Sequence, residues 1–339
     1  MFRRYGPPMD VDRADAPRFE KGSFNGHYES WFLRANHPDR PDAFWIRYTI
    51  FAPKNQPERA EGELWAIAFR EGQPPFALKT EIPMSDCHFG RDRGLDVRVG
   101  DARLWGEGRE GTAEGRIALE ERSLRWRLRF EGARDPLLLL PERLYDAPLP
   151  KAKALVPRPA CAFTGELVVD GESMEVHGWR GSQNHNWGSK HTDEYAWGQV
   201  VGFEGDPDAF LEVSTARIHL GPVKTPWLTP MVLREGGHEH HLGGLLRAVR
   251  NDGSYELGQW TFAAKGKGVQ VEGTFSAPPE SFVALPYRNP PGGLKTCMNA
   301  KVARCELSIR RRGERPRRLL SPHGAAFEIL RDARPGEHE

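Results

Sequence analysis

The sequence has no apolar run near the length of about 20 residues that a membrane-spanning helix needs. Residues 1–22 contain arginines but no apolar core behind them, so we expect no signal peptide. Net charge is almost absent as well, because 48 basic and 47 acidic residues leave a balance of +1. These absences predict a cytoplasmic protein with no transmembrane segment and without nucleic acid as its main partner. They remain compatible with a peripheral membrane contact.

Cysteine is scarce, and the few cysteines are far apart. The four positions are Cys87, Cys161, Cys297 and Cys305, with no CxxC pair and no spacing typical of zinc sites. We therefore expect reduced, mostly buried thiols. The sequence also contains no phosphate-binding glycine loop, no dinucleotide fingerprint and no GxSxG motif, so we expect no cofactor and no bound metal.

Alternation of apolar and polar residues is present throughout the chain, most clearly in residues 123–132. Four large apolar side chains fall on one face there and three arginines on the other: Leu124, Trp126, Leu128 and Phe130 against Arg125, Arg127 and Arg129. This pattern is typical of a half-buried antiparallel strand. Glycine-containing turns at 170–171, 236–237 and 265–268 indicate hairpins, and helix candidates such as residues 323–333 are short. The predicted fold class is all-β, with barrels or sandwiches.

A proline-rich segment lies near the middle of the chain, with six prolines between residues 136 and 159. Proline removes the N–H group that a sheet needs, so we expect an extended connector there rather than a strand. The segment divides the chain into parts of similar size, each near the length of one small barrel. We therefore predict two domains, residues 1–150 and residues 151–339.

The stretch from residue 178 to residue 200 is unusually polar and aromatic. Its notable residues are Gln183, Asn184, His185, Asn186, Trp187, His191, Asp193, Tyr195 and Trp197. Gly181 and Gly188 indicate tight turns. Strand alternation puts Asp193 on the side of Tyr195 and Trp197. If that side is a barrel interior, the acid lines its mouth.

Three interpretations of this stretch stay open. Trp187, Tyr195 and Trp197 can line one apolar pocket with His185 at its polar end. Alternatively, the amides and imidazoles serve only to hydrogen-bond the backbone of a turn. A metal held by His185, His191 and Asp193 is the weakest of the three, because zinc ligands usually follow a tighter spacing.

A second stretch, residues 25–38, contains Glu29 among the aromatic residues Tyr28, Trp31 and Phe32. A carboxyl group in such surroundings either has a raised pKa and acts as an acid or pairs with an arginine, and we favour the pair. Two polar runs, HEHH at 238–241 and RRRGERPRR at 310–318, fit solvated hairpin ends better than a metal site or an RNA contact.

The segments YESWFL (28–33) and NHNWG (184–188) resemble a lipocalin-like group of proteins. That group contains carotenoid 1,2-hydratase (hydroxyneurosporene synthase), AttH-like proteins and, more distantly, tocopherol cyclase. The resemblance implies two lipocalin-like antiparallel β-barrel domains and a lipophilic ligand, often an isoprenoid, between them. It also implies cofactor-free protonation of a carbon–carbon double bond, followed by hydration, cyclisation or isomerisation.

With this resemblance, we assign candidate roles to residues of the two stretches. Asp193 is the candidate acid, with His185 and His191 as its catalytic partners. Ligand contacts are expected from Gln183, Asn184, Asn186, Trp187, Tyr195, Trp197, Glu29 and Trp31. A non-catalytic carrier or sensor of a lipid-like ligand is the alternative, and a metal-dependent hydrolase is a weaker third.

Overall fold

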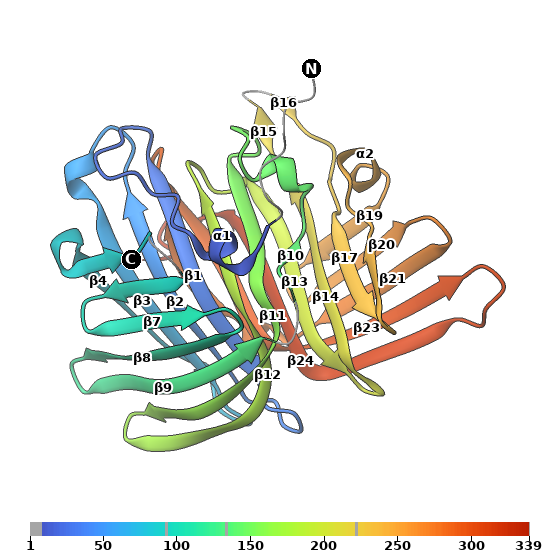
Figure 1. Ribbon diagram of the computed structural model, residues 1–339, viewed down its shortest axis with the longest axis horizontal. Coiled ribbons are helices and arrows are strands. Elements are labelled where there is room, and N and C mark those ends of the chain that lie inside the picture. Colours follow the sequence, from blue (N-terminus) through green and yellow to red (C-terminus); the bar gives the residue numbers. More distant parts are fainter. Residues whose placement is uncertain (1–8, 92–93, 133–134, 221–222, 339) are drawn as a thin grey trace.

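Figure 1 shows the computed structural model of the protein, in which residues 9–91, 94–132, 135–220 and 223–338 are described. Two large antiparallel sheets contain most of these residues. One sheet forms a nearly closed barrel and the other a half-barrel, so the prediction of an all-β chain with two antiparallel barrel-like domains is confirmed. Among the described residues, no helix is long and apolar enough to cross a membrane.

The first sheet has 12 strands, in the spatial order β4-β3-β2-β1-β12-β11-β9-β8-β7-β6-β5, with β10 beside β11. The strands are β1 (His27–Asn36), β2 (Ala43–Ala52), β3 (Glu61–Phe69), β4 (Phe76–Pro83), β5 (Cys87–Phe89), β6 (Leu95–Val99), β7 (Ala102–Glu107), β8 (Glu110–Leu119), β9 (Arg122–Gly132), β10 (Leu137–Leu138), β11 (Ala152–Val169) and β12 (Glu172–Gly188). The short helices in this part are α1 (Val11–Asp15), η1 (Pro57–Arg59), η2 (Met84–Asp86) and η3 (Glu142–Leu144).

The second sheet has 10 strands, in the order β18-β17-β14-β13-β24-β23-β21-β20-β19, with β22 beside β23. The strands are β13 (Glu194–Phe203), β14 (Asp206–Arg217), β17 (Met231–Glu235), β18 (His238–His241), β19 (Asp252–Glu256), β20 (Gln259–Lys265), β21 (Val269–Ser276), β22 (Val283–Arg288), β23 (Leu294–Arg311) and β24 (Arg317–Asp332). The remaining elements are β15 (His219–Leu220), β16 (Val223–Lys224), α2 (Leu245–Ala248) and η4 (Pro279–Ser281).

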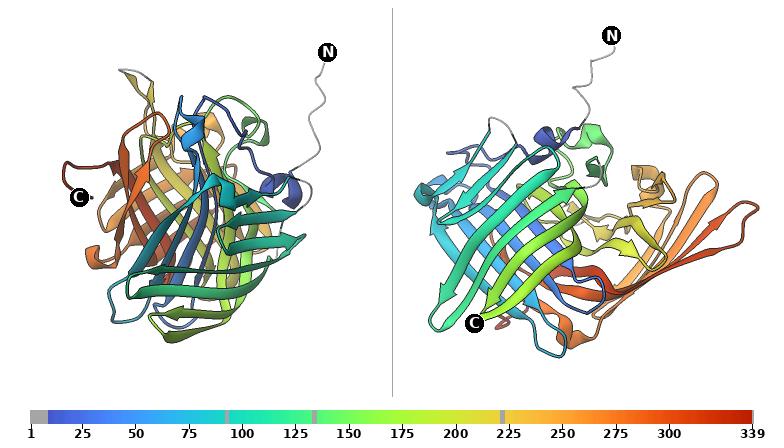
Figure 2. Two further views of the ribbon diagram at one scale, coloured as in Figure 1. Left: turned by 90° about the vertical axis from the view of Figure 1, so that its left-hand side faces the viewer. Right: turned by 60° about the horizontal axis from the view of Figure 1, so that its bottom comes forward.

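Apolar alternation builds the core of each sheet. In β9, Leu124, Trp126, Leu128 and Phe130 are buried inside the first barrel while the intervening arginines are exposed, as predicted. A separate core fills the second sheet around Trp260, Phe275 and Phe327. A third apolar cluster joins the outer faces of both sheets, with members from β1, β2 and β3 on one side and β22, β23 and β24 on the other. Figures 1 and 2 show the sheets side by side, with β11 and β12 between the two halves.

The chain changes from the first sheet to the second between β12 and β13, at residues 189–193. The predicted domain boundary at 150/151 precedes β11, which pairs with β9 and β12 in the first sheet. As a boundary between independently folding units, that division stays a prediction.

The proline-rich segment differs from the prediction. We expected a connector, but its second part is the start of β11, which contains Pro157 and Pro159. The pairing of β11 with β12 shifts register between Leu155 and Arg158 and again between Arg158 and Cys161. The prolines therefore occupy bulged positions, where a missing N–H group interrupts no ladder.

The polar stretch around residue 185 is a strand, so the predicted tight turns at Gly181 and Gly188 are wrong. Both glycines lie in β12, and neither has a positive φ. A Cβ atom would collide with the backbone carbonyl of Arg34 at the first position and of Lys151 at the second. Close approach of neighbouring strands, rather than a turn, explains the two glycines.

The C-terminal helix candidate, residues 323–333, is also wrong, because most of it belongs to β24. Ala325, Phe327 and Ile329 point into the second core, and Leu330 lies in the cluster between the sheets. Two buried faces explain why the apolar residues do not simply alternate.

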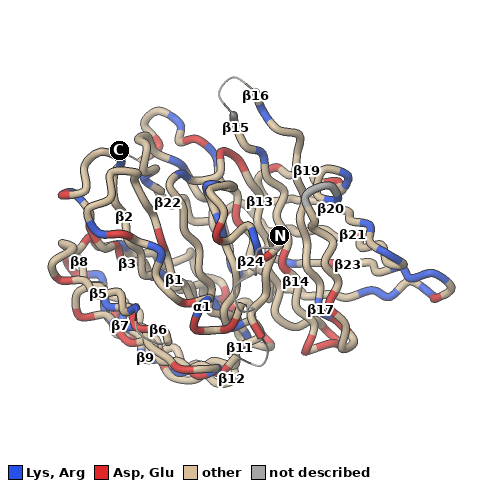
Figure 3. Tube along the Cα trace, turned by 45° about the horizontal axis from the view of Figure 1, so that its top comes forward, with Lys and Arg blue, Asp and Glu red and all other residues tan. Residues whose placement is uncertain are grey.

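The two polar runs lie at hairpin ends. Residues 310–318 form the tip of the β23–β24 hairpin, a mostly blue segment in Figure 3, and are largely exposed. Residues 238–241 form β18 after the glycine turn at 236–237 and are mainly exposed.

Candidate active site between the two sheets

Strand β12 presents different side chains to two environments. Residues 183, 185 and 187 face the first barrel, where His185 stacks on Trp31 at 4.6 Å and on Trp187 at 4.8 Å. Residues 182 and 184 face the second sheet and hydrogen-bond to Gln199 of β13. The predicted site residues of β12 are therefore divided between two environments.

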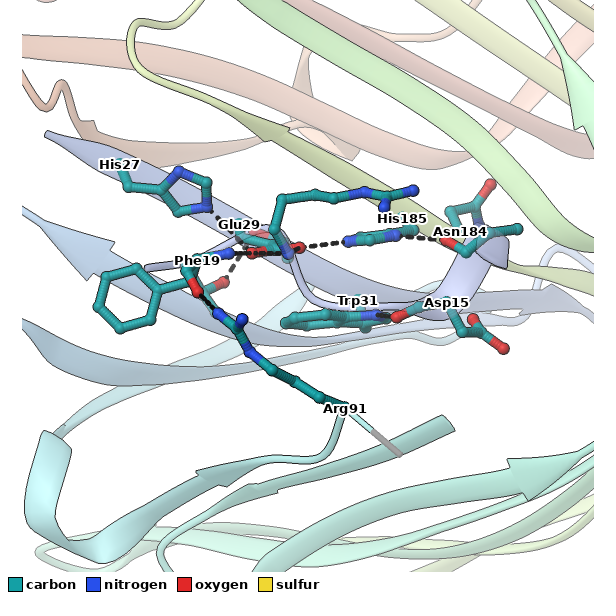
Figure 4. Close-up of polar contacts among 12 residues, drawn as sticks. Asp15, Phe19, His27, Glu29, Trp31, Arg91, Asn184 and His185 are labelled. Carbon is teal, nitrogen blue, oxygen red and sulfur yellow. Dashed lines mark hydrogen bonds and ion pairs between the residues drawn. The ribbon is translucent and has the colours of Figure 1, made fainter. Parts of the chain in front are cut away.

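The barrel cluster consists of Asp15, Glu29, Arg158, Gln183 and His185. Its centre is Glu29, which accepts hydrogen bonds from His185 Nε2 at 2.8 Å and His27 Nε2 at 3.0 Å (Figure 4). The backbone N–H groups of Arg18 and Phe19 also donate to this carboxylate, at 2.7 and 2.8 Å. Glu29 is thus paired, as favoured, but with imidazoles and amides instead of an arginine side chain.

These hydrogen bonds keep Glu29 ionised. Burial alone raises its pKa, but the hydrogen bonds from His185 and His27 outweigh burial and lower the pKa to about 2. His185 also hydrogen-bonds the carbonyl of Ala14 through Nδ1, at 2.6 Å. Only a ring with both nitrogens protonated donates to both acceptors at once. The pair therefore resembles a fixed ion pair more than a proton donor.

The rest of the barrel cluster fixes the N-terminal segment across the barrel. Arg158 Nη1 contacts Asp15 at 2.5 Å and Gln183 Oε1 at 2.9 Å, and Gln183 Nε2 donates to Asp15 at 3.0 Å. Trp31 Nε1 donates to the Asp15 carbonyl at 3.0 Å (Figure 4). Both members of the ion pair are fully buried. This arrangement joins residues 14–19 to β1, β11 and β12.

The interface network lies on the opposite face of β12. It consists of Arg34, Ser182, Asn184, Trp197, Gln199 and Glu212. Glu212 of β14 accepts a hydrogen bond from Trp197 Nε1 at 2.7 Å and one from Gln199 Nε2 at 2.8 Å. Gln199 is held in turn by Asn184, Ser182 and Arg34 of the first sheet. Glu212 is thus connected to both sheets.

Burial raises the pKa of Glu212 to about 7, even though the hydrogen bonds from Trp197 and Gln199 act in the opposite direction. The side chain is therefore partly protonated at neutral pH. A buried carboxyl group with a pKa near neutrality can give up a proton and take it back.

Aromatic rings and further charges surround this network. Phe32 lies 6.2 Å from both Trp45 and Trp197. The Lys301 ammonium lies 5.7 Å from the Trp45 ring and 5.8 Å from the Trp197 ring, and it pairs with Glu328 at 2.7 Å. Tyr195 and Trp197 are only partly buried although they lie between the sheets, so packing is incomplete here.

Among the described residues, several buried polar atoms have no hydrogen-bond partner. Two of them, Trp45 Nε1 and Asn186 Oδ1, belong to the strand faces turned towards the second sheet. Buried polar atoms without partners are uncommon, and they mark places where a bound molecule can supply the partner.

The structure does not bring Asp193, His185 and His191 together. Among the described residues, these three share no hydrogen bond or ion pair. Asp193 contacts Lys190 at 2.6 Å and accepts from the His219 amide at 2.8 Å. Burial opposes ionisation, but these hydrogen bonds lower its pKa. The acid role of Asp193 stays a prediction, in surroundings that favour the carboxylate.

His191 lies at one end of the interface. It stacks on Tyr28 at 3.9 Å, and its Nε2 hydrogen-bonds the Arg288 carbonyl at 3.1 Å. Burial lowers its pKa to about 3, so the ring is neutral at pH 7. Trp187, in contrast, packs with Tyr145 and Leu155 beneath the N-terminal segment. It is therefore separate from Tyr195 and Trp197, which lie at the interface.

An open pocket of about 880 Å³ lies beyond His191. Its wall includes Phe51, Glu61, Glu81, Arg288 and Asn289, and Asn289 also accepts a hydrogen bond from the His191 amide. Carboxylate oxygens of Glu61, Glu63 and Glu81 lie within 4.8 Å of one another, the spacing of a metal site. Lys79 and Arg288 form ion pairs with these carboxylates, so each of the three already has a cationic partner from the protein.

Sequence reasoning missed Glu212 and Arg47, the residues with the least ordinary surroundings at the interface. A signal for the first exists, because FLEV (210–213) places a lone carboxylate in an apolar run. Arg47 similarly interrupts the apolar segment FWIRYTIF (44–51).

No family model matches the chain. The uncharacterized protein Rv0493c of Mycobacterium tuberculosis strain H37Rv is 26% identical over 291 residues, which cover 84% of this chain and 82% of that protein. The protein MT0513 of strain CDC 1551 matches with the same values.

Several crystal structures share the fold. Kievitone hydratase from Nectria haematococca has a TM-score of 0.58 at 9% identity, covering 96% of each chain. CghA in complex with Sch210972 has a TM-score of 0.58 at 11% identity, covering 92% of this chain and 90% of CghA. An AttH-like protein from Nitrosomonas europaea has a TM-score of 0.56 at 11% identity, covering 95% and 99%. The expected likeness to AttH-like proteins is confirmed for the fold.

Proposed function

We propose that the protein binds a lipophilic small molecule between its two sheets and catalyses cofactor-free, acid-catalysed hydration, cyclisation or isomerisation of it. The single observation that carries this proposal is Glu212, a buried carboxyl group with a pKa near 7 beside the indole of Trp197. Protonation of a carbon–carbon double bond needs an acid that is still protonated at neutral pH, and burial supplies it.

The surroundings of Glu212 suit the rest of that chemistry. Phe32, Trp45 and Trp197 offer aromatic faces to a developing carbocation. Gln199 and Asn184 position the carboxyl group from both sheets. Of the residues expected to contact the ligand, Asn184, Asn186, Tyr195 and Trp197 lie at this interface and keep that role in the proposal.

The other expected contacts are Gln183, Trp187, Glu29 and Trp31, and all belong to the barrel side of β1 and β12. Their hydrogen bonds and stacking hold the N-terminal segment, so we assign them a positioning role. The known proteins with this fold support the general class, since one is named a hydratase and another was crystallised with a small organic molecule. An isoprenoid ligand, a peripheral membrane contact and a cytoplasmic location are part of the same proposal.

The test starts from the protein purified from its own host, with native mass spectrometry to identify a retained molecule. Turnover of that molecule, or of its precursor, is then measured for the wild type, Glu212→Gln and Asp193→Asn. Removal of a general acid lowers kcat by roughly 100-fold to 10,000-fold. We expect this loss for Glu212→Gln and nearly unchanged kcat for Asp193→Asn. The opposite result would transfer the acid role to Asp193.

A non-catalytic carrier is the second candidate, and one observation favours it. Both oxygens of Glu212 already accept hydrogen bonds, from Trp197 and Gln199, as expected of a group that only holds the sheets together. A carrier would bind the retained molecule equally in Glu212→Gln and release it unchanged. A metal-dependent hydrolase is not proposed, because His185, His191 and Asp193 lie in separate surroundings.

A further inference from the structure

Arg47 of β2 is buried between the sheets with unused hydrogen-bond donors. Its Nε donates to Ser30 Oγ at 2.8 Å, and its guanidinium lies 4.4 Å from the Tyr287 ring centroid and 5.9 Å from that of Trp45. Its exposed fraction is 4%. Within the described part of the chain, neither terminal amino group has a hydrogen-bond partner. Neither is among the fully buried atoms without a partner, so both keep some contact with accessible space.

The other deeply buried arginines differ from Arg47. Arg158 forms an ion pair with Asp15, and Arg34 donates to Gln199, Asn36 and the Gly324 carbonyl through its terminal amino groups. One nitrogen of each, Arg158 Nη2 and Arg34 Nε, is buried without a partner, whereas Arg47 leaves both terminal amino groups unused. A buried cation without a hydrogen-bonded counter-charge is costly, so such a group is usually paired. Arg47 therefore lacks the hydrogen-bonded anionic partner that a buried guanidinium usually has.

Tyrosine hydroxyls from both sheets supply further donors near Arg47. Among the described residues, the hydroxyls of Tyr28 from β1 and Tyr195 from β13 have no hydrogen-bond partner, and both side chains lie near enough to Arg47 to affect its pKa or to be affected by it. Burial raises the pKa of these hydroxyls, so they remain protonated and able to donate. Trp45 Nε1 is one more unpartnered donor on the same face.

The charges at the interface are unbalanced. The buried cations are Arg34, Arg47 and Lys301, whereas the nearby carboxylates are Glu328 and the partly protonated Glu212. Glu63 also interacts with Arg47 electrostatically, but it forms ion pairs with Lys79 at 3.0 Å and with Arg288. Burial opposes the charge of Arg47, but Glu63 and Glu328 outweigh burial and raise its pKa, so the guanidinium stays charged. A charged guanidinium whose terminal amino groups are unused is consistent with a site for an anion.

We infer that Arg47, with Tyr28 and Tyr195, binds the ionised carboxylate of an otherwise apolar ligand. This inference rests on the proposed function and narrows the substrate to an apolar carboxylic acid. The two amino groups of one guanidinium match the two oxygens of a planar carboxylate, and one positive charge matches its single negative charge. Phe32, Trp45 and Trp197 then contact the apolar part of the ligand.

The pocket near His191 lies next to the side chains that surround Arg47. Arg288 and Phe51 line that pocket and stack on each other at 4.2 Å. Behind them, His191 lies between Tyr28 at 3.9 Å and Tyr287 at 5.7 Å, and Tyr287 contacts Arg47. The pocket and the arginine are therefore connected by one chain of stacked rings.

The experiment compares laurate, dodecanol and dodecyl phosphate as probes of the wild type by isothermal titration calorimetry at pH 7.5. These probes share an alkyl chain and differ in the head group. We expect laurate to bind at least about tenfold more tightly than dodecanol, the effect of a free-energy difference of about 1.4 kcal/mol. Laurate should also bind more tightly than dodecyl phosphate. Equal affinity for laurate and dodecanol, preference for the phosphate, or no binding of laurate would overturn the inference.

Variants then assign the preference to Arg47. Arg47→Met should lower laurate affinity to that of dodecanol and leave dodecanol binding unchanged. Arg127→Met is the matched control, because Arg127 is exposed on β9, and it should retain the laurate preference. If Arg47→Met does not fold, Arg47→Lys is measured in its place. The comparison of the three probes on the wild type still tests whether the protein prefers a carboxylate. A laurate preference that survives loss of Arg47 contradicts the assignment.

Glu212→Gln separates this inference from the proposed function. It should keep the laurate preference while losing turnover. A laurate preference in the wild type combined with full turnover by Glu212→Gln would support the carboxylate site and refute the acid. The reverse combination would support the acid and refute the carboxylate site.

Discussion

The barrel cluster and the interface network lie on opposite faces of the same strand, and they treat buried charge differently. In the barrel cluster, Glu29 is surrounded by four donors and Asp15 has a guanidinium partner. At the interface, Arg47 keeps unused donors and Glu212 has a pKa near 7. The two carboxylates of the barrel cluster are thus fully paired, although Arg158 Nη2 has no partner there. A fully paired charge stabilises the structure, whereas a donor or carboxyl group with unused capacity is available to a ligand or a proton.

The largest effect should come from removing one member of the buried ion pair. Arg158→Met leaves the carboxylate of Asp15 buried without its partner, and such changes typically cost about 3–5 kcal/mol of the free energy of unfolding. Urea denaturation measures the loss. Arg304→Ala is the control, because its ion pair with Glu306 is exposed and worth at most about 1 kcal/mol. A loss below 1 kcal/mol for Arg158→Met would mean that this cluster is not structural.

Glu29 should stabilise the fold above its unperturbed pKa and lose that effect in acid. Its pKa is lowered from 4.5 to about 2, so the stabilisation is complete above pH 4.5 and disappears as pH falls towards 2. We expect Glu29→Gln to cost on the order of 3 kcal/mol at pH 7, with the difference from the wild type vanishing near pH 2. Chemical denaturation across this pH range measures it, and a constant difference would contradict the assignment.

Glu212 should affect the pH dependence of stability in the opposite direction. Its pKa is raised from 4.5 to about 7, so the folded state retains a proton that the unfolded state releases, and stability falls as pH rises from 4.5 to 7. Glu212→Gln removes this slope, and we expect it to gain about 3 kcal/mol on the wild type between pH 4.5 and pH 8. Parallel stability curves for the two proteins would mean that Glu212 ionises normally.

The smallest effect is expected at Arg47. Arg47→Met removes the cost of burying a cation but also removes its hydrogen bond to Ser30 and its contact with the Tyr287 ring, so stability should change by less than about 1 kcal/mol. Urea denaturation beside Arg158→Met makes the comparison direct, since the same substitution is made at two buried arginines. A loss of the same size at both positions would show that Arg47 is structural.

Much of the fold could be predicted from the sequence because one-sided strands carry a clear alternation. β9 is the plainest case, with apolar residues inside and arginines outside. β24 was misread as a helix because both of its faces are buried, so the alternation is lost. The prolines of β11 led to the prediction of a connector instead of a strand. A β-bulge accommodates a proline that a regular hydrogen-bonded ladder excludes.

The site was predictable only in part. Alternation correctly places Tyr195 and Trp197 on one face of β13, but it does not say which face is the barrel interior. In the structure, Ala196 and Gly198 face the core of the second sheet. Ala196 is part of that core, and a Cβ at Gly198 would meet the rings of Phe275 and Trp260. The partners of Asp193 and Glu212 come from distant strands, so no local pattern distinguishes the ionised carboxylate from the protonated one.

The pairing of β1 with β12 has a consequence for synthesis on the ribosome. Tyr28 at one end of β1 pairs with Gly188, and Asn36 at the other pairs with Arg180. Translation adds about 5–20 residues per second, so the edge of β1 that pairs with β12 stays unpaired for roughly ten to thirty seconds before β12 has been synthesised. The side chains along this unpaired edge include the charged residues Glu29 and Arg34 and the polar residue Asn36. Charged side chains on an unpaired strand edge discourage pairing with another nascent chain.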